Sequence, residues 1–290
     1  MPWRHIVCDQ VGCSHKTKWL MIMHTSPEHS HYDVSECMDF YRGVLTILSD
    51  QKVPFLVGGG YALFVLTGIS RMTKDLDLFI RREDIPRTLK SLAEAGFETE
   101  LAYSHWLAKA RKGDDFVDLI FSSGNGHCPV DEGWFQNAVS ATIGGLPIKL
   151  APAEEMIWQK SFIMERERYD GADIAHLFHV RARTLDWNRL LRRFGSDWRV
   201  LLSHLILFGF IYPGEQRLVP VGVMQELIDR LKREVDSPPP ADLECGGTLL
   251  SREQYAVDVN DWNYLDKRLV PRGEMTPLQV AEWTPPKGSA

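Results

Sequence analysis

The sequence predicts an α+β protein with a small mixed β-sheet core flanked by helices, followed by a C-terminal helical domain. Two observations carry this prediction. Up to about residue 150, short apolar stretches such as FLV and DLDLFI alternate with glycine turns and helical segments. Beyond that point apolar residues recur at helical spacing, for example at Met224, Leu227 and Leu231.

The composition predicts a soluble globular protein with a full hydrophobic core. The chain has 290 residues, of which 44% are hydrophobic, and a formal net charge of −6. This charge argues against a protein that coats nucleic acid, although basic residues outnumber acidic ones, nine to six, between Lys160 and Arg199. A local groove for a polyanion and a solvated helix surface explain that bias equally well.

Cysteines and apolar runs indicate a cytoplasmic protein. The five cysteines are odd in number and widely spread, which favours a reducing compartment over a disulfide framework. The apolar run Trp19 to Met23 is too short for a signal peptide. The run Leu201 to Tyr212 is too short to cross a bilayer, so we expect a buried helix there and no membrane partner.

Four regions are expected along the chain. Residues 1-34 lack periodicity and are expected to be an irregular leader, residues 35-150 the α/β core, and residues 151-236 a helical domain. Residues 237-290, which begin with SPPP, are expected to be a Pro/Gly-rich tail that wraps the protein or is partly disordered.

Within these regions the patterns predict individual helices and strands. Helices are expected at residues 35–50, 153–168, 173–181, 186–194, 198–207 and 221–235, and a further one after Asp84. Besides the strands on either side of the glycines, strands are expected at residues 97–102, 106–110, 116–121 and 147–150, with a hairpin turn at 112–115.

Three aspartates in strand context indicate a metal site. Asp75 and Asp77 alternate with Leu76 and Leu78, so they point to the same face of a strand. Two carboxylates on a strand otherwise suited to burial are costly unless a cation lies between them, and Mg²⁺ prefers one or two carboxylates plus phosphate oxygens. Asp118 lies in a later strand, VDLI, and is a third acid of the same kind.

The glycines upstream of Asp75 favour a phosphate site beside that metal. Gly58, Gly59 and Gly60 end a short apolar strand and precede an apolar segment, the pattern of a strand, a tight turn and a helix. Without Cβ atoms the backbone can approach a triphosphate closely, and the free N–H groups of a helix start attract anions. Phosphoryl or nucleotidyl transfer needs metal and phosphate at one place.

A lysine on a buried helix face adds a candidate cation. Lys160 falls in the middle of an apolar stripe, where it needs an anionic partner or a route to water. Asp170 and Asp173 follow closely and act either at the site or as caps of the next helix.

Taken together, these motifs resemble the polymerase-β nucleotidyltransferase superfamily, and most closely its abortive-infection-toxin-like and minimal nucleotidyltransferase branch. The resemblance covers roughly residues 53 to 180 and is specific in combination, whereas each motif alone is weak. The leader, the tail and Gly171 depart from the pattern. The matching segments are GGYA at 59–62, RMTKDLD at 71–77, VDLI at 117–120, PAEE at 152–155 followed by Lys160, and RYDGAD at 168–173.

The resemblance implies transfer of an NMP from an NTP, the donor substrate, to a hydroxyl acceptor with two Mg²⁺ ions. Asp75 and Asp77 would hold Mg²⁺ against the phosphates. Asp118 would complete the coordination of the ion that activates the acceptor hydroxyl and would accept the proton of that hydroxyl. Gly59 and Gly60 would lie under the triphosphate. Nucleotide binding would also use Arg71, Thr73 and Lys160. The positive charges of Arg71 and Lys160 would neutralise the departing pyrophosphate.

Other functions stay open at this point. One alternative is a catalytically inactive module of the same fold that binds nucleotide or a partner. A second is a dinucleotide-binding enzyme, although Leu63 stands where that fingerprint requires its third glycine. Within the transferase reading the acceptor is RNA, a protein hydroxyl or an aminoglycoside-like small molecule, and base preference, oligomeric state and toxin-antitoxin pairing are open.

Overall fold

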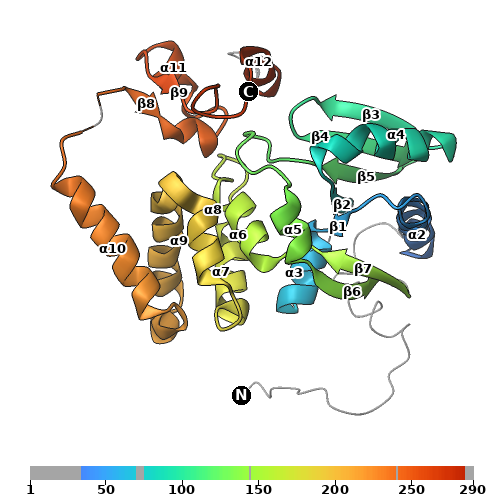
Figure 1. Cartoon of the computed structure of the whole chain (residues 1–290), viewed down its shortest axis with the longest axis horizontal. Helices are drawn as coiled ribbons and strands as arrows, with labels where there is room; N and C mark the ends of the chain where they lie inside the picture. Colours follow the sequence, from blue (N-terminus) through green and yellow to red (C-terminus); the bar gives the residue numbers. More distant parts are fainter. Residues whose placement is uncertain (1–33, 70–74, 144, 240, 285–290) are drawn as a thin grey trace.

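The computed structural model describes residues 34–69, 75–143, 145–239 and 241–284. A mixed seven-stranded sheet lies at one side of the molecule, and a layer of helices, α6 to α10, lies at the other (Figure 1). The predicted fold class, an α+β core with a sheet followed by a helical region, is confirmed.

The first half supplies every strand of the large sheet. Its hairpin β4–β5 turns at Gly113, whose φ of +63° is a left-handed conformation that glycine adopts without strain. The edge strand β6 was not predicted. The elements are α2 (Val34–Asp50), β1 (Leu56–Val57), α3 (Gly59–Thr67), β2 (Leu76–Phe79), α4 (Ile85–Glu94), β3 (Glu98–Tyr103), β4 (Leu107–Lys112), β5 (Asp115–Ile120), α5 (Glu132–Gln136), β6 (Val139–Ile143) and β7 (Leu146–Leu150).

The strand order of the sheet is β3-β4-β5-β2-β1-β7-β6. Strands β2 and β5 are parallel, as are β1 and β7, and the other neighbours are antiparallel. A dinucleotide-binding βαβ unit needs two parallel strands around its glycine turn. Because β1 and β2 pair antiparallel, the dinucleotide-binding alternative is wrong.

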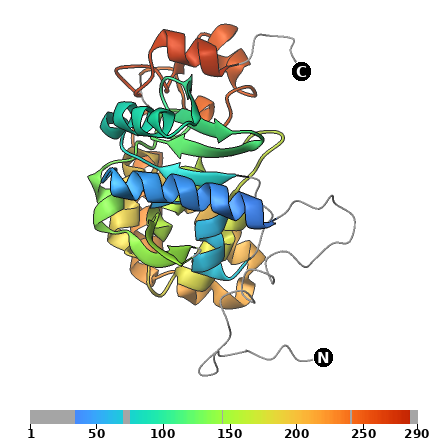
Figure 2. The same ribbon diagram turned by 90° about the vertical axis from the view of Figure 1, so that its right-hand side faces the viewer.

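The two faces of the sheet differ at its centre. Leu78 and Leu119 are fully buried. Helix α2, which runs across the sheet in Figure 2, contacts β5, and α4 contacts α2 and the outer strands β3 and β4. Burial of such leucine side chains contributes roughly 2 kcal/mol each. Asp77, Asp118 and Lys109 alternate with the buried residues and therefore emerge on the opposite face.

The second half is mostly helical, and a short two-stranded sheet joins its end. The described residues between 151 and 235 contain helices and loops, with a single bridge between Met164 and Tyr169. The elements are α6 (Ala153–Ser161), α7 (Gly171–Arg181), α8 (Trp187–Phe194), α9 (Trp198–Ile211), α10 (Val221–Val235), β8 (Glu244–Cys245), α11 (Ala256–Asn260), β9 (Leu265–Asp266) and α12 (Pro277–Trp283).

Helix α6 ends earlier than predicted. The expected helix over residues 153–168 stops at Ser161, and the chain then forms a hairpin in which Met164 pairs with Tyr169. This reversal brings Asp170 to within 2.6 Å of the ammonium of Lys160. A lysine in an apolar stripe needs such a partner, so the ion pair accounts for a turn that periodicity alone does not predict.

The helices α8 and α9 follow each other through the short 3₁₀ turn Gly195–Asp197. Together they form a run of 25 residues, Trp187–Ile211. An 18-residue window within this run has a mean hydropathy of 1.2, so by length and composition alone the run would suffice to cross a membrane. That run is longer than the apolar stretch considered in the sequence. Because Leu201 and Phe208 are fully buried in the core, the run also has the character of a core helix, and such helices meet the same criterion.

The segment 241–284 contacts both halves of the molecule. Figure 1 shows it returning from α10 across the helices to α12, which lies beside β3. Ser251 donates a hydrogen bond of 2.6 Å to Glu165 in the loop after α6. Trp283 packs edge-on against Tyr103 at a centroid distance of 5.2 Å. The segment therefore bridges the sheet and the helical region.

Candidate active site

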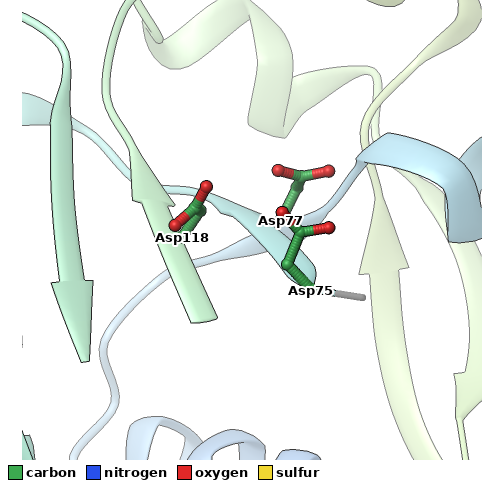
Figure 3. Close-up of side chains that lie close together, drawn as sticks. All are labelled: Asp75, Asp77 and Asp118. Carbon is green, nitrogen blue, oxygen red and sulfur yellow. The ribbon is translucent and has the colours of Figure 1, made fainter. Parts of the chain in front are cut away.

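Sheet register brings the three predicted aspartates together. Asp77 on β2 lies directly opposite Asp118 on the parallel strand β5, and Asp75 precedes β2. Carboxylate oxygens of all three lie within 4.8 Å of one another, and Figure 3 shows the side chains facing a common space. The convergence expected from the sequence is present.

Charge repulsion within this group is visible in the pKa of Asp77. Burial and, to a smaller extent, the neighbouring carboxylates of Asp75 and Asp118 together raise that pKa to about 7, although Lys160 and Arg168 act to lower it. The pKa of Asp118 is also raised, chiefly by burial. Carboxylates with this mutual cost are stabilised by a hard cation between them.

The glycine turn lies against the aspartates. Gly59 begins α3 with a φ of +54°, and a Cβ built on it would lie 1.7 Å from Oδ2 of Asp77. A Cβ on Gly58 would lie 2.0 Å from the ring of Phe79. Any side chain at either position would collide with a side chain of β2, so the close approach of turn and strand favours glycine at both. Gly60 follows Gly59 in the first turn of α3.

Lys160 lies on the helical side of the site and is held by two carboxylates. Its ammonium donates hydrogen bonds to Asp170 at 2.6 Å and to Asp173 at 2.8 Å. The anionic partner that the sequence requires for this lysine is thereby identified. Neither aspartate caps α7 through its side chain, because Asp170, the N-cap residue, makes no side-chain cap hydrogen bond.

Arg168 is a second cation on this side, and the sequence motifs assigned it no role. Its guanidinium donates to Asp170 at 3.1 Å, and its side chain is 65% exposed against 13% for Lys160. It also acts electrostatically on Asp77. Arg168 is therefore the more accessible of the two cations next to the aspartates.

Lys109 is the residue that the sequence reasoning missed outright. It lies opposite Asp118 on β4, and its ammonium donates to Oδ1 of Asp118 at 2.6 Å. The signal was present, because a hairpin turning at Gly113 and Asp114 pairs residue 109 with residue 118. The predicted hairpin therefore implies the pairing of Lys109 with Asp118, which the alternation within either strand does not show.

Two predicted nucleotide-binding residues cannot be placed in this arrangement. Arg71 and Thr73 lie in the stretch 70–74, outside the described residues. Their proposed role stays a prediction.

The residues present fit a divalent metal ion. Three carboxylates from adjacent strands share one space, and carboxylate oxygens are the ligands that Mg²⁺ prefers. The glycine turn and the start of α3 lie on the same side as Asp77, where backbone N–H groups favour an anion. The site therefore has ligand atoms for a cation and, next to them, the start of α3, whose backbone N–H groups can bind phosphate oxygens.

Comparisons with solved structures give matches at low similarity, and several of the matched structures are described only as nucleotidyltransferase-like or as unconfirmed nucleotidyltransferases. The antibiotic-resistance factor ANT(2'')-Ia matches with 17% identity and a TM-score of 0.42, over 59% of this chain and 97% of its own. The lincosamide antibiotic adenylyltransferase LnuA matches with 17% identity and a TM-score of 0.36, over 49% of this chain and 96% of its own. JHP933 from Helicobacter pylori matches with 13% identity and a TM-score of 0.36, over 72% and 97%.

The search of curated proteins returned no match. A model of a family described as uncharacterised nucleotidyltransferases matches residues 39–202, more than half of the chain. That region includes all three aspartates, the glycine turn, Lys109 and Lys160. The protein therefore belongs to this family of uncharacterised nucleotidyltransferases.

Proposed function

We propose that this protein transfers an NMP from an NTP to a hydroxyl acceptor with Mg²⁺ bound by Asp75, Asp77 and Asp118. The observation that carries the proposal is the convergence of three carboxylates within 4.8 Å beside the glycine turn. Phosphoryl chemistry needs a cation to bind the phosphate oxygens and a base to accept the proton of the acceptor.

In this proposal Asp75 and Asp77 act on the NTP donor, and Asp118 acts on the acceptor. Mg²⁺, when bound, would orient the triphosphate and offset the negative charge that develops on it. Asp75 and Asp77 would hold this cation on the donor side, and Asp118 would help to hold a second ion at the acceptor. Asp118 lies at the β4 side of the group and accepts the proton of the acceptor hydroxyl as its oxygen attacks the α-phosphorus and the bond to pyrophosphate breaks.

The donor phosphates are bound by the glycine turn and the cations of the helical side. Gly59 and Gly60 let the backbone approach the triphosphate, next to the metal ligand Asp77. Arg168, the more exposed cation, neutralises the departing pyrophosphate. Lys160, which the sequence placed at the nucleotide, is paired with Asp170 and Asp173, and in this proposal it keeps those two carboxylates in place. Arg71 and Thr73 complete the nucleotide site in this proposal.

The alternative of an inactive binding module predicts loss of one or more metal ligands. Asp75, Asp77 and Asp118 are all present and converge, which supports an active enzyme. The acceptor in this proposal is a hydroxyl of an RNA, a protein or a small molecule, and a direct assay separates these three.

The test is incubation of the full chain with α-labelled NTPs, Mg²⁺ and separate pools of RNA, protein and aminoglycosides. Label is expected in one pool, and it is expected to disappear on addition of EDTA. Asp77→Asn removes a metal ligand and should abolish the transfer. Asp114→Asn, in the exposed β4–β5 turn, removes an equal charge away from the site and should leave it unchanged. Absence of label from every pool would favour the inactive module.

A further inference from the structure

Lys109 has two acidic neighbours across the sheet and its ammonium contacts one of them. In register it lies between Glu100 on β3 and Asp118 on β5. Its hydrogen bond goes to Asp118 Oδ1, whereas Glu100 forms an ion pair of 3.7 Å with Arg111. The lysine therefore faces the candidate active site.

The lysine is held in this orientation by its surroundings. Its side chain is 20% exposed, that of Asp118 is 14% exposed, and the ammonium lies 4.8 Å from the centroid of the Phe116 ring. A half-buried ammonium over an aromatic face beside a carboxylate has little freedom to turn away. One oxygen of Asp118 is thus occupied, and the other is available to the space shared with Asp75 and Asp77.

We propose that Lys109 is a positioning residue that ties one oxygen of Asp118 and weakens the binding of a divalent ion there. The ammonium orients Asp118 so that a single oxygen serves the ion and the acceptor. It also places a positive charge next to the position of that ion. The two ion positions of this site are therefore unequal, with tight binding at Asp75 and Asp77 and weak binding at Asp118.

The size of the effect follows from charge repulsion. An ammonium and a divalent ion about 5 Å apart repel each other enough, even at the dielectric constant of water, to change an ion affinity about tenfold. The lost lysine charge also leaves both oxygens of Asp118 free for the ion. Removal of the ammonium should therefore raise the ion affinity while acceptor positioning, and with it turnover, declines. A side chain that only supported the fold would lower both.

The test measures Mn²⁺ binding to the full chain by electron paramagnetic resonance, without NTP. In the natural chain we expect one tight ion and a second at least about tenfold weaker, both lost in Asp77→Asn. In Lys109→Met the weaker ion is expected to bind about tenfold more tightly, and Lys109→Arg should retain the natural affinity. Lys112→Met removes the same charge from the end of the same strand, where the ammonium lies over Phe97, and should leave Mn²⁺ binding unchanged.

Each outcome bears on one claim. Natural Mn²⁺ affinity in Lys109→Met would overturn the role of Lys109, whatever the assay for transfer shows. If Lys109→Met does not fold, Lys109→Gln, which retains a hydrogen-bond donor without the charge, is expected to show the same tighter ion, and natural affinity there would overturn the proposal equally. The inference rests on the proposed function only for its effect on turnover. Tighter Mn²⁺ binding in Lys109→Met, without transfer by the natural chain to any acceptor, would reject the enzymatic proposal and support the role of Lys109.

Discussion

Two clusters of charged side chains make up the candidate site, and they differ in their balance of charge. The sheet cluster contains three acids and one lysine, whereas the helical cluster contains two acids and two cations. In the sheet cluster the pKa values of Asp77 and Asp118 are raised, chiefly by burial. The sheet cluster is Asp75, Asp77, Asp118 and Lys109, and the helical cluster is Lys160, Arg168, Asp170 and Asp173.

The helical cluster behaves in the opposite way. Burial alone would raise the pKa of Asp170, but hydrogen bonds and charge from Arg168 and Lys160 hold it below its usual value. Its acids are therefore satisfied within the protein, and it has no need of an ion. The sheet cluster has a net negative charge, whereas the helical cluster is neutral. This difference indicates that the acids of the sheet cluster are the ones that bind a metal ion.

The largest expected effect is on catalysis at the sheet cluster. Asp77→Asn should lower the turnover number at least about a thousandfold, because it removes a metal ligand from the reacting centre. The measurement is transfer from labelled NTP to the acceptor identified by the pool assay. Asp170→Asn, in the helical cluster, should cost far less. Equal losses in the two variants would remove the distinction between the clusters.

A large effect on stability is expected at the helical cluster. Lys160→Met leaves Asp170 and Asp173 without their shared lysine in a mostly buried position, which should cost about 3–5 kcal/mol in the free energy of unfolding. Urea denaturation measures this loss. Gln225→Met, on the exposed surface of α10, is a control that should change stability little. A loss below about 1 kcal/mol for Lys160→Met would show that the cluster is solvated.

The dependence of stability on pH should come from the sheet cluster. Between pH 4 and 7 folded Asp77 keeps a proton that the unfolded chain releases, because its pKa is raised to about 7. Stability therefore falls as pH rises through that window. In EDTA the melting temperature should be about 2–4 °C lower at pH 8 than at pH 6, and Mg²⁺ should offset the difference.

Two controls separate this effect from other titrations. Asp77→Asn should remove most of the difference between pH 6 and pH 8. The lowered pKa of Asp170 has the opposite sign, since its contribution is lost only as pH falls below the usual range of carboxylates. Melting temperatures in EDTA that do not differ between pH 6 and pH 8 would contradict the raised pKa of Asp77.

The smallest effect is expected at Arg168, the exposed edge of the helical cluster. Arg168→Ala should raise the KM for NTP about fivefold to tenfold through the loss of one phosphate contact, with little change in melting temperature. Arg166→Ala, whose side chain is 78% exposed in the same loop, is the matched control. An unchanged KM in Arg168→Ala would remove this residue from the donor site.

The sequence predicted the sheet cluster better than the helical one for a physical reason. Alternation in a strand fixes the face of Asp75 and Asp77, and the glycines mark the adjacent turn, so local pattern is sufficient. The family match confirms the resemblance to nucleotidyltransferases, and the abortive-infection-toxin-like branch stays a prediction.

Contacts between distant segments were harder to predict. The contact of Lys109 with Asp118 depends on the register of the β4–β5 hairpin. The ion pair of Lys160 with Asp170 depends on the chain reversal that follows the end of α6 at Ser161. Neither is a property of local periodicity. The segment 241–284 has short helices held by tertiary contacts, such as those of Trp283 with Tyr103 and Trp106, which no repeating pattern predicts.

The central claim is that Asp75, Asp77 and Asp118 together bind divalent ions. Calorimetric titration of Mn²⁺ into the natural chain, Asp118→Asn and Asp173→Asn tests it most directly. We expect the natural chain and Asp173→Asn to bind alike, and Asp118→Asn to lose the weaker ion. Unaltered binding in Asp118→Asn would show that this aspartate does not belong to the site and would contradict the account.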